Sequence, residues 1–323
     1  MKPKLLFITA VLFLFGILLI TGCEKQATNP NPSPEVLSLK SALKNLYTGE
    51  TVKVTCNAVD PDGEGLSYSW SATGGTFANA TLPQVDFTAP AQPGGVVIKC
   101  AVSDAKGQRW ATVNVNVATP PPLLARWTFD TDFKDKAGTN DGTPGTGTSI
   151  TNADFKVGTG SAKFTGTASS VAGMVTDGTA LGMGPQDNFT ITLWLRTRDT
   201  AGWLFGRLLA KGVWDRNAKG IYITGSNLAF AVRRISTMNT GIAVNDSVWH
   251  HVAVSKNGLS VTVFLDGNQV ANQTYSDWTV DDNTTVCMGA YASGAYLGLI
   301  DDIRFYGRAM VSDEIGKVVK ETQ

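Results

Sequence analysis

The sequence predicts an all-β protein made of two β-sandwich domains, with one short helix near the C-terminal end. Apolar and polar residues alternate over many short stretches, which is the pattern of strands with one buried face. The 34 glycines recur with Asn and Asp between these stretches, as tight turns require. Residues 119–122, Thr-Pro-Pro-Pro, separate the two predicted domains.

Composition excludes one class of partner. The 323 residues contain 27 Lys and Arg and 27 Asp and Glu, so the formal net charge is 0. Nucleic-acid binders carry a basic stripe or patch, and no Lys/Arg cluster of that kind occurs in this sequence. We therefore expect no nucleic-acid partner.

The first 22 residues have the pattern of a signal peptide. Lys2 and Lys4 precede an apolar run over residues 5–20, which is short for a membrane span. The run ends in Ile-Thr-Gly before Cys23, and this ending resembles a bacterial lipobox. The resemblance implies that Cys23 carries a lipid; the alternative is an ordinary signal peptide followed by a chance cysteine.

The residue after the cysteine bears on location. In Gram-negative lipoproteins an Asp at this position is associated with inner-membrane retention, and here the residue is Glu24. The resemblance therefore implies an outer-membrane lipoprotein in the bacterial cell envelope, facing the periplasm or the outside. Residues 23–34 are rich in Pro and Asn and form the predicted lipidated tether, so the membrane is contacted only through the lipid.

Residues 35–118 form the first predicted domain. Val52, Val54 and Cys56 share one face of a strand, and further alternating strands follow. The order Cys56, Trp70, Cys100 and the turns between them resemble bacterial Ig-like and PKD-like domains. That resemblance implies an Ig-like β-sandwich with a disulfide between Cys56 and Cys100, acting as a spacer.

One turn of this domain has two interpretations. Asp60 and Asp62 would suit calcium, as in cadherin-like repeats. The alternative is a solvated turn, since Asp-Pro and Asp-Gly are turn-forming pairs.

Residues 123–323 form the second predicted domain. Several of its segments, in order, resemble the laminin-G-like family of concanavalin A-like jelly rolls. The most specific are RWTFD at 126–130, WHHVAV at 249–254, LDG at 265–267 and IDDIRFY at 300–306. The resemblance implies a jelly-roll sandwich, and Ser312-Asp313-Glu314 predicts the capped start of the terminal helix.

Some glycosidases share this fold, so the resemblance also allows a catalytic function. They need two carboxylates flanking the glycosidic bond. Glu314 and Glu321 are the only glutamates of the second domain, and both fall near its C-terminal end. The adjacent His250 and His251 point to opposite faces of one strand and cannot share a metal or nucleophile. The sequence therefore predicts a protein that is not an enzyme.

The family resemblance also implies a calcium site, with Asp130 and Asp302 as oxygen ligands. Calcium takes 6–8 oxygens, and backbone carbonyls near residues 158–160 would supply others. The alternative is that these carboxylates cap turns or pair with Arg126 or Arg304. The sequence does not decide between the two interpretations; on the first of them, calcium is a structural cofactor of this domain.

Sugar recognition needs aromatic platforms beside fixed polar groups. Three candidate tryptophans lie in or beside turn-rich stretches, where a ring could face solvent: Trp203, Trp214 and Trp278. Tyr222 and, on an adjacent predicted strand, Arg233 are the further candidate carbohydrate-binding residues. The alternative is that the rings cover the edge of the core.

These features predict a cell-surface lipoprotein that binds a polysaccharide or other glycan through its jelly roll. The alternative is a protein-binding module for adhesion or scaffolding in a surface complex, because the fold does not determine the function.

Overall fold

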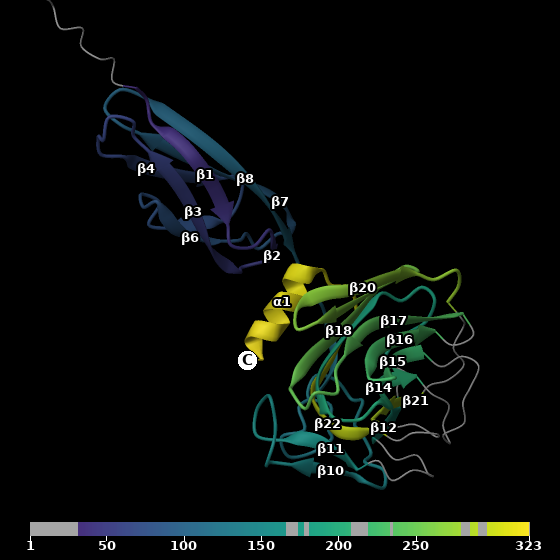
Figure 1. The fold of residues 1–323 in the computed structure, drawn as a ribbon. Coiled ribbons are helices and arrows are strands. Elements are labelled where there is room, and N and C mark those ends of the chain that lie inside the picture. Colours follow the sequence, from purple (N-terminus) through teal and green to yellow (C-terminus); the bar gives the residue numbers. More distant parts are fainter. Residues whose placement is uncertain are drawn as a thin grey trace, which may run out of the picture.

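The computed structural model describes residues 32–165, 174–177, 181–207, 219–232, 235–278, 285–289 and 296–322. Within these residues the chain forms strands β1–β22 and one helix, α1, which confirms the predicted all-β class and the short C-terminal helix. Figure 1 shows two bodies that meet end to end. In the described part of the chain, no helix is long and apolar enough to cross a membrane. Cys23 and the rest of residues 1–31 lie outside it.

The first body consists of two four-stranded sheets. The strands of one sheet, in spatial order, are β1 (Glu35–Ser41), β3 (Thr51–Val59), β6 (Gln84–Thr88) and β5 (Thr76–Ala78). Those of the other are β2 (Asn45–Tyr47), β8 (Gln108–Ala118), β7 (Gly94–Ser103) and β4 (Ser67–Ala72). The alternating residues Val52, Val54 and Cys56 point into the core between the sheets, as their period of two predicts.

The second body consists of a larger pair of sheets. The strands of the eight-stranded sheet are β10 (Thr148–Thr151), β11 (Ser161–Thr165), β22 (Leu297–Tyr306), β13 (Phe189–Thr197), β18 (His250–Asn257), β19 (Ser260–Leu265) and β20 (Asn268–Thr274), with β9 (Leu123–Trp127) also on β22. Those of the six-stranded sheet are β12 (Met174–Asp177), β21 (Thr285–Met288), β14 (Ala201–Arg207), β15 (Lys219–Thr224), β16 (Asn227–Val232) and β17 (Ser236–Ala243).

The core of the second body lies between these sheets. Phe189, Ile191 and Leu193 of β13 are fully buried and face Phe205 and Phe230 of the other sheet. Phe305 of β22 stacks on Phe189 with ring centroids 5.5 Å apart. The two hydrophobic cores are separate, one drawn from residues 46–117 and the other from residues 125–305.

Helix α1 (Ser312–Glu321) packs on the outer face of the eight-stranded sheet through Ile315 and Val318. Its N-cap residue is Val311, one position before the Ser312 that the sequence suggested. Because valine has no capping oxygen, the helix start is satisfied by Glu314 instead. The Glu314 carboxylate accepts the Val311 N–H at 3.0 Å and pairs with Arg308.

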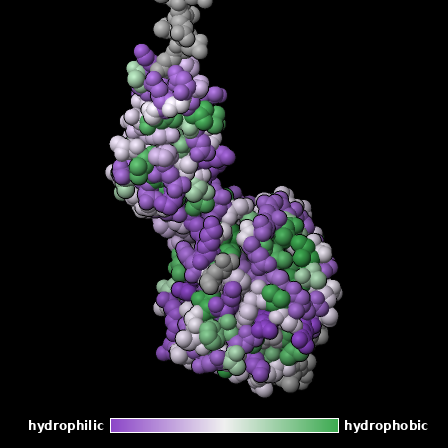
Figure 2. All heavy atoms as spheres, turned by 60° about the vertical axis from the view of Figure 1, so that its left-hand side comes forward, coloured by the Kyte–Doolittle hydropathy of each residue, from purple (hydrophilic) through white to green (hydrophobic). Residues whose placement is uncertain are grey.

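The same helix joins the two bodies. The Lys317 Nζ lies 2.5 Å from Oε2 of Glu50, donates to the Asn45 carbonyl at 3.1 Å and sits 3.9 Å from the Tyr47 ring centroid. Asn45 also donates to Asp313 at 3.1 Å. Figure 2 shows a largely hydrophilic surface at the waist between the bodies, in keeping with a joint built from ion pairs and hydrogen bonds.

Candidate functional site

A groove of about 430 Å³ lies on the outer face of the eight-stranded sheet, where β11, β22 and β13 are adjacent. It is at the end of the second body distant from helix α1 and the first body (Figure 1). The residues that line it come from five separate segments: Thr151, Ala153, Asp154, Lys163, Phe164, Arg196, Thr197, Arg198, Ser247, Leu297, Gly298 and Leu299.

Strand alternation explains why polar side chains gather on this face. Leu193 and Leu195 of β13 point into the core, so Arg196 points outward. The register pairs Arg196 with Leu299 of β22, and Leu299 with Lys163 of β11. One row across three strands therefore reads Lys163, Leu299, Arg196, with an aliphatic residue between two cations.

The polar groups of the groove are held by fixed partners. The Arg196 Nη1 donates to the Asp154 carboxylate at 2.6 Å, and its Nε donates to the Ser247 carbonyl at 2.7 Å. The Arg198 Nε donates to the Ser247 hydroxyl at 2.6 Å. Asp154 also accepts the indole N–H of Trp249 at 3.0 Å. These bonds orient the groove before any ligand arrives, which lowers the entropy lost on binding.

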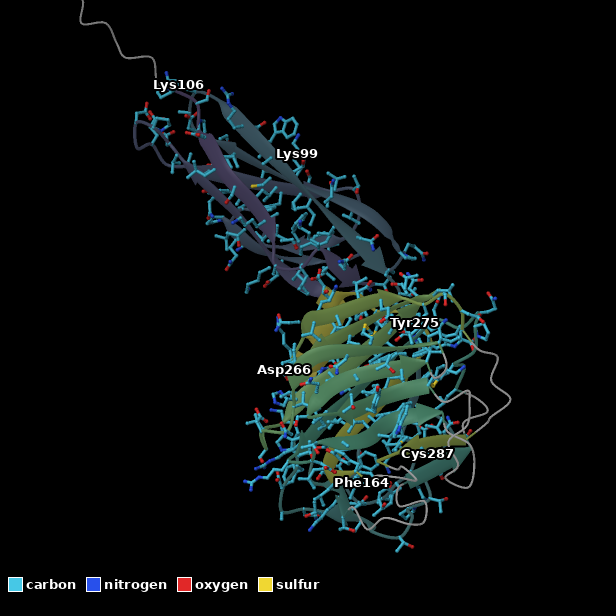
Figure 3. The ribbon with its side chains drawn as sticks, turned by 45° about the vertical axis from the view of Figure 1, so that its right-hand side comes forward. Lys99, Lys106, Phe164, Asp266, Tyr275 and Cys287 are labelled. Atoms are coloured by element: carbon cyan, nitrogen blue, oxygen red, sulfur yellow. The ribbon has the colours of Figure 1, made fainter. Side chains whose placement is uncertain are left out.

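The apolar part of the lining is partly open to solvent. Leu297 is 50% exposed, whereas the Phe164 side chain belongs to the core between the sheets. Figure 3 labels Phe164 near the end of the second body that is distant from the first. The Phe164 ring meets Tyr296 edge-on at 5.8 Å, and the Tyr296 hydroxyl donates to the Leu299 carbonyl at 3.0 Å. An exposed apolar residue beside a few oriented polar groups is compatible with a small-ligand site.

A buried acidic pair lies next to the groove on β22. Asp301 accepts the backbone N–H groups of Lys156 and Val157 at 2.8 and 2.9 Å. Burial nevertheless raises the pKa of Asp301 to about 7. Asp302 differs, because its two oxygens accept Nε–H of Arg126 at 2.7 Å and of Arg304 at 2.9 Å.

These contacts do not fit the predicted calcium site. Both oxygens of Asp302 already have an arginine partner, and Asp130 caps the turn at Thr159, accepting its N–H at 2.5 Å. Among the described residues, no group of three or more His, Cys, Asp or Glu side chains could hold a metal ion. The structure shows the alternative interpretation, turn capping and arginine pairing. In the first body, Asp60 likewise caps its own turn.

The predicted aromatic platform is not assembled as expected. Trp203 and Trp278 are only 3% and 2% exposed, so the prediction that their rings face a sugar is wrong. Trp203 lies within β14, stacked on Tyr222 of β15 at 4.9 Å, and Tyr222 is half-buried. Both belong to the six-stranded sheet and not to the sheet that carries the groove. Trp214 and Arg233 lie outside the described residues.

Trp278 is buried because it completes the core after β20. Its ring stacks near Phe230 and meets Phe189 edge-on, with centroids 6.3 and 6.2 Å apart. The Nζ atoms of Lys219 and Lys256 lie 5.4 and 4.6 Å from its centroid. Such cation–π contacts, with carbonyls that accept from both lysines, allow these two amines to be buried.

Cys56 and Cys100 are both buried in the core of the first body, as free thiols in this structure. Burial raises the pKa of each thiol, and each has the other as a hydrogen-bond partner. Their disulfide stays a prediction. Cys287 is also buried, which raises the pKa of its thiol to about 12 and leaves little nucleophilic thiolate.

Neither histidine lines the groove. His250 lies between Asp266 and Asp246, with ring nitrogens 2.8 and 3.2 Å from their oxygens, and the bond to Asp266 raises its pKa. His251 is buried edge-on against Trp194, and burial lowers its pKa to about 3.

Lys163, Arg196 and Arg198 were not among the site residues that the sequence predicted. A signal was present, since Arg196 follows four core residues at alternate positions in Phe189–Thr197 and must lie on the outer face. What the sequence did not show is that residues near 150, 163, 196, 247 and 298 converge, because four of these five segments are brought together by non-local strand pairing.

Comparison with known proteins identifies the fold of the second body. Residues 169–316 match the sequence profile of the concanavalin A-like lectin/glucanases superfamily. No curated protein matches the chain in sequence.

Several solved structures are similar. The binding domain of Paraclostridial Mosquitocidal Protein 1 aligns with a TM-score of 0.51 and 15% identity, over 62% of this chain and 52% of that one. The receptor-binding domain of botulinum neurotoxin type G aligns with a TM-score of 0.48 and 12% identity, over 62% and 51%. Domain 4 of AbnA, a GH43 extracellular arabinanase from Geobacillus stearothermophilus solved with arabinotriose, aligns with a TM-score of 0.42 and 20% identity. The alignment covers 62% of this chain and 98% of that domain.

The chain thus spans about half the length of the two toxin domains. At such identities the structural likeness shows the fold alone. Together with the profile match, it establishes that residues 169–316 form a concanavalin A-like domain.

Proposed function

We propose that this protein is a non-catalytic carbohydrate-binding protein of the bacterial cell surface, and that the groove on the eight-stranded sheet holds the glycan. The observation that carries the proposal is the lining of the groove: oriented Arg, Asp and Ser groups around an exposed leucine. Sugars present hydroxyl groups at their edges and C–H groups on their faces, and this lining complements both.

The shape of the site favours a glycan over a protein partner. The site is a shallow groove, and its two arginines are already hydrogen-bonded to fixed backbone and side-chain groups. A protein interface of standard size buries about 800 Å² on each partner and has an apolar centre. Leu297 is the one strongly exposed large aliphatic residue among those lining the groove.

The carboxylates of the groove support a binding role without catalysis. Glycosidases need two carboxyl groups on either side of the scissile bond. The lining contains one, Asp154, and its oxygens are engaged by Arg196 and Trp249. This arrangement suits a carboxylate that helps to orient a ligand.

The position of the groove supports a surface role. Lipidation of Cys23, the prediction from the N-terminal segment, would anchor the chain on the side of the first body, where the described residues begin. The groove lies at the opposite end of the molecule (Figure 1), so it would face away from the membrane. The first body would then act as the spacer.

The test is binding of residues 24–323 to a polysaccharide panel, measured by affinity electrophoresis and calorimetry. Leu297→Asp places a charge on the exposed part of the groove, and we expect it to weaken binding about fivefold, the loss of about 1 kcal/mol of apolar contact. Leu259→Asp is the matched control: Leu259 is 39% exposed, in the turn after β18 at the far end of the sheet.

Weaker binding by Leu297→Asp, with unchanged binding by Leu259→Asp, supports the groove as the glycan site. Equal binding by both variants would place the ligand elsewhere on the molecule. If no polysaccharide binds, the proposal fails and a surface protein becomes the better candidate partner.

A further inference from the structure

The charge of the groove differs from the charge of the whole chain. The chain has a formal net charge of 0. The groove is lined by three cationic side chains, Lys163, Arg196 and Arg198, and by one carboxylate, Asp154. A small concave surface on a neutral protein therefore carries an excess of positive charge.

Only one of these cations is neutralised by the protein. Arg196 forms the ion pair with Asp154 at 2.6 Å. Within the described residues, Arg198 and Lys163 form no ion pair: Arg198 donates to the neutral Ser247 hydroxyl, and Lys163 is exposed. Two positive charges at the groove are left for a ligand.

A neighbouring carboxylate, Asp199, is paired with neither of these cations among the described residues. Asp199 follows Arg198 on the chain, but its oxygens accept the backbone N–H groups of Thr200 at 2.8 Å and Leu297 at 3.2 Å. It therefore fixes the rim of the groove through backbone bonds and forms no ion pair with either cation in the described part of the structure. The guanidinium of Arg198 is held by Ser247, so an arriving anion meets an oriented donor.

We propose that the groove selects acidic polysaccharides, those bearing carboxylate or sulfate groups, and that Lys163 and Arg198 bind the anionic group. This rests on the carbohydrate-binding function proposed above. In this arrangement Leu297 and Leu299 contact the face of a sugar ring, while the cations bind the acid at its edge.

The experiment compares matched ligands that differ in charge alone. Polygalacturonate and its methyl ester test the carboxylate, and dextran sulfate and dextran test the sulfate. We expect residues 24–323 to bind at least one acidic member about tenfold more tightly than its neutral counterpart at about 0.05 M salt. The difference should shrink at about 1 M salt, where the Debye length falls to about 3 Å.

Variants identify the residues. We expect Lys163→Gln and Arg198→Gln each to weaken acidic-ligand binding about two- to fivefold, in the range of an exposed ion pair, and to leave neutral-ligand binding unchanged. Lys106→Gln is the control, an exposed lysine on the first body at the far end of the molecule (Figure 3).

Two outcomes would overturn the inference. Equal affinity for acidic and neutral members, with both lost in Leu297→Asp, would refute charge selection while leaving glycan binding in place. A preference for acidic ligands that survives in the Lys163→Gln, Arg198→Gln double variant would refute the assignment of these residues. Absence of binding to every ligand would refute the proposed function as well.

Discussion

The buried His251 should make the second domain less stable in mild acid. Its side chain is 1% exposed beneath helix α1, edge-on to Trp194, and its Nδ1 has no hydrogen-bond partner among the described residues. Burial lowers the pKa of His251 to about 3, with the nearby Arg304 acting in the same direction and Asp266 opposing it. The folded protein therefore keeps the ring neutral down to strongly acidic pH.

The sign and size of the effect follow from this pKa. In the unfolded chain a histidine takes up a proton below about pH 6.5, so acid favours the unfolded state. Above about pH 6.5 the ionisation of His251 does not reduce the free energy of unfolding. Below that pH the free energy of unfolding falls by about 1.4 kcal/mol for each pH unit, until the pKa of the folded state is reached. Between about pH 8 and pH 5 this residue should remove about 2 kcal/mol from the free energy of unfolding.

Urea unfolding of the protein and of His251→Asn at both pH values measures the difference. The variant should lose about 2 kcal/mol less than the parent on acidification, whatever its stability at pH 8. His250→Gln is an informative control with the opposite sign, because bonding to Asp266 raises the pKa of His250. Its contribution is present below about pH 6.5 and is lost as the pH rises through the folded pKa.

Equal acid losses in the parent and in His251→Asn would refute the reasoning. If the variant does not fold, NMR titration of the parent decides instead. The ring signals of His251 should stay unchanged down to about pH 4, and a midpoint near 6.5 would contradict the burial argument.

Three further outcomes are expected. Asp302→Asn keeps a residue type that tolerates the positive φ of 42° but leaves Arg126 and Arg304 without their carboxylate, so the free energy of unfolding should fall by about 3 kcal/mol in a denaturant titration. Calcium or a chelator should leave the melting temperature unchanged, since the same arginines occupy Asp302; a rise with calcium would contradict this. Lys317→Ala removes the ion pair with Glu50 and should loosen the joint between the bodies, which small-angle X-ray scattering would detect as a larger radius of gyration, without changing the melting of either body.

The fold was predictable to a large extent because the information is local. Alternation of Val52, Val54 and Cys56 identified both the strand and its core face, and their burial confirms it. The LDG motif at 265–267, part of the resemblance to the laminin-G-like family, forms the hairpin between β19 and β20.

The site was less predictable because it depends on long-range pairing. The sequence predicted an accessible ring for Trp278 because the residue lies in or beside a turn-rich stretch. Whether such a residue folds inward depends on space in the core, which Phe189 and Phe230 provide from other strands. A position near a turn in the sequence does not determine whether the side chain points into the core or into solvent.

The sequence could not decide between calcium binding and arginine pairing at Asp302 for a related reason. Asp302 is part of the IDDIRFY motif at 300–306, but the role of its carboxylate depends on the side chains of the adjacent strand. Pairing of β9 with β22 brings Arg126 across from Arg304, and the two guanidinium groups hold the carboxylate between them. A sequence motif shows that a carboxylate is present, but it does not show which side chains of the adjacent strand will contact that carboxylate.

Strand β22 has a mechanical consequence for a protein that holds a ligand. It begins at Leu297 in the groove and ends at Tyr306, close to the joint with the first body, so its ten residues span about 30 Å. A pull on a bound chain would load β22 along its own axis. Its hydrogen bonds to β11, β13 and β9 would then be loaded together, in shear geometry, and would resist the pull jointly. In a peeling geometry the same bonds would break one after another. The strand is placed to carry tension from the ligand to the spacer.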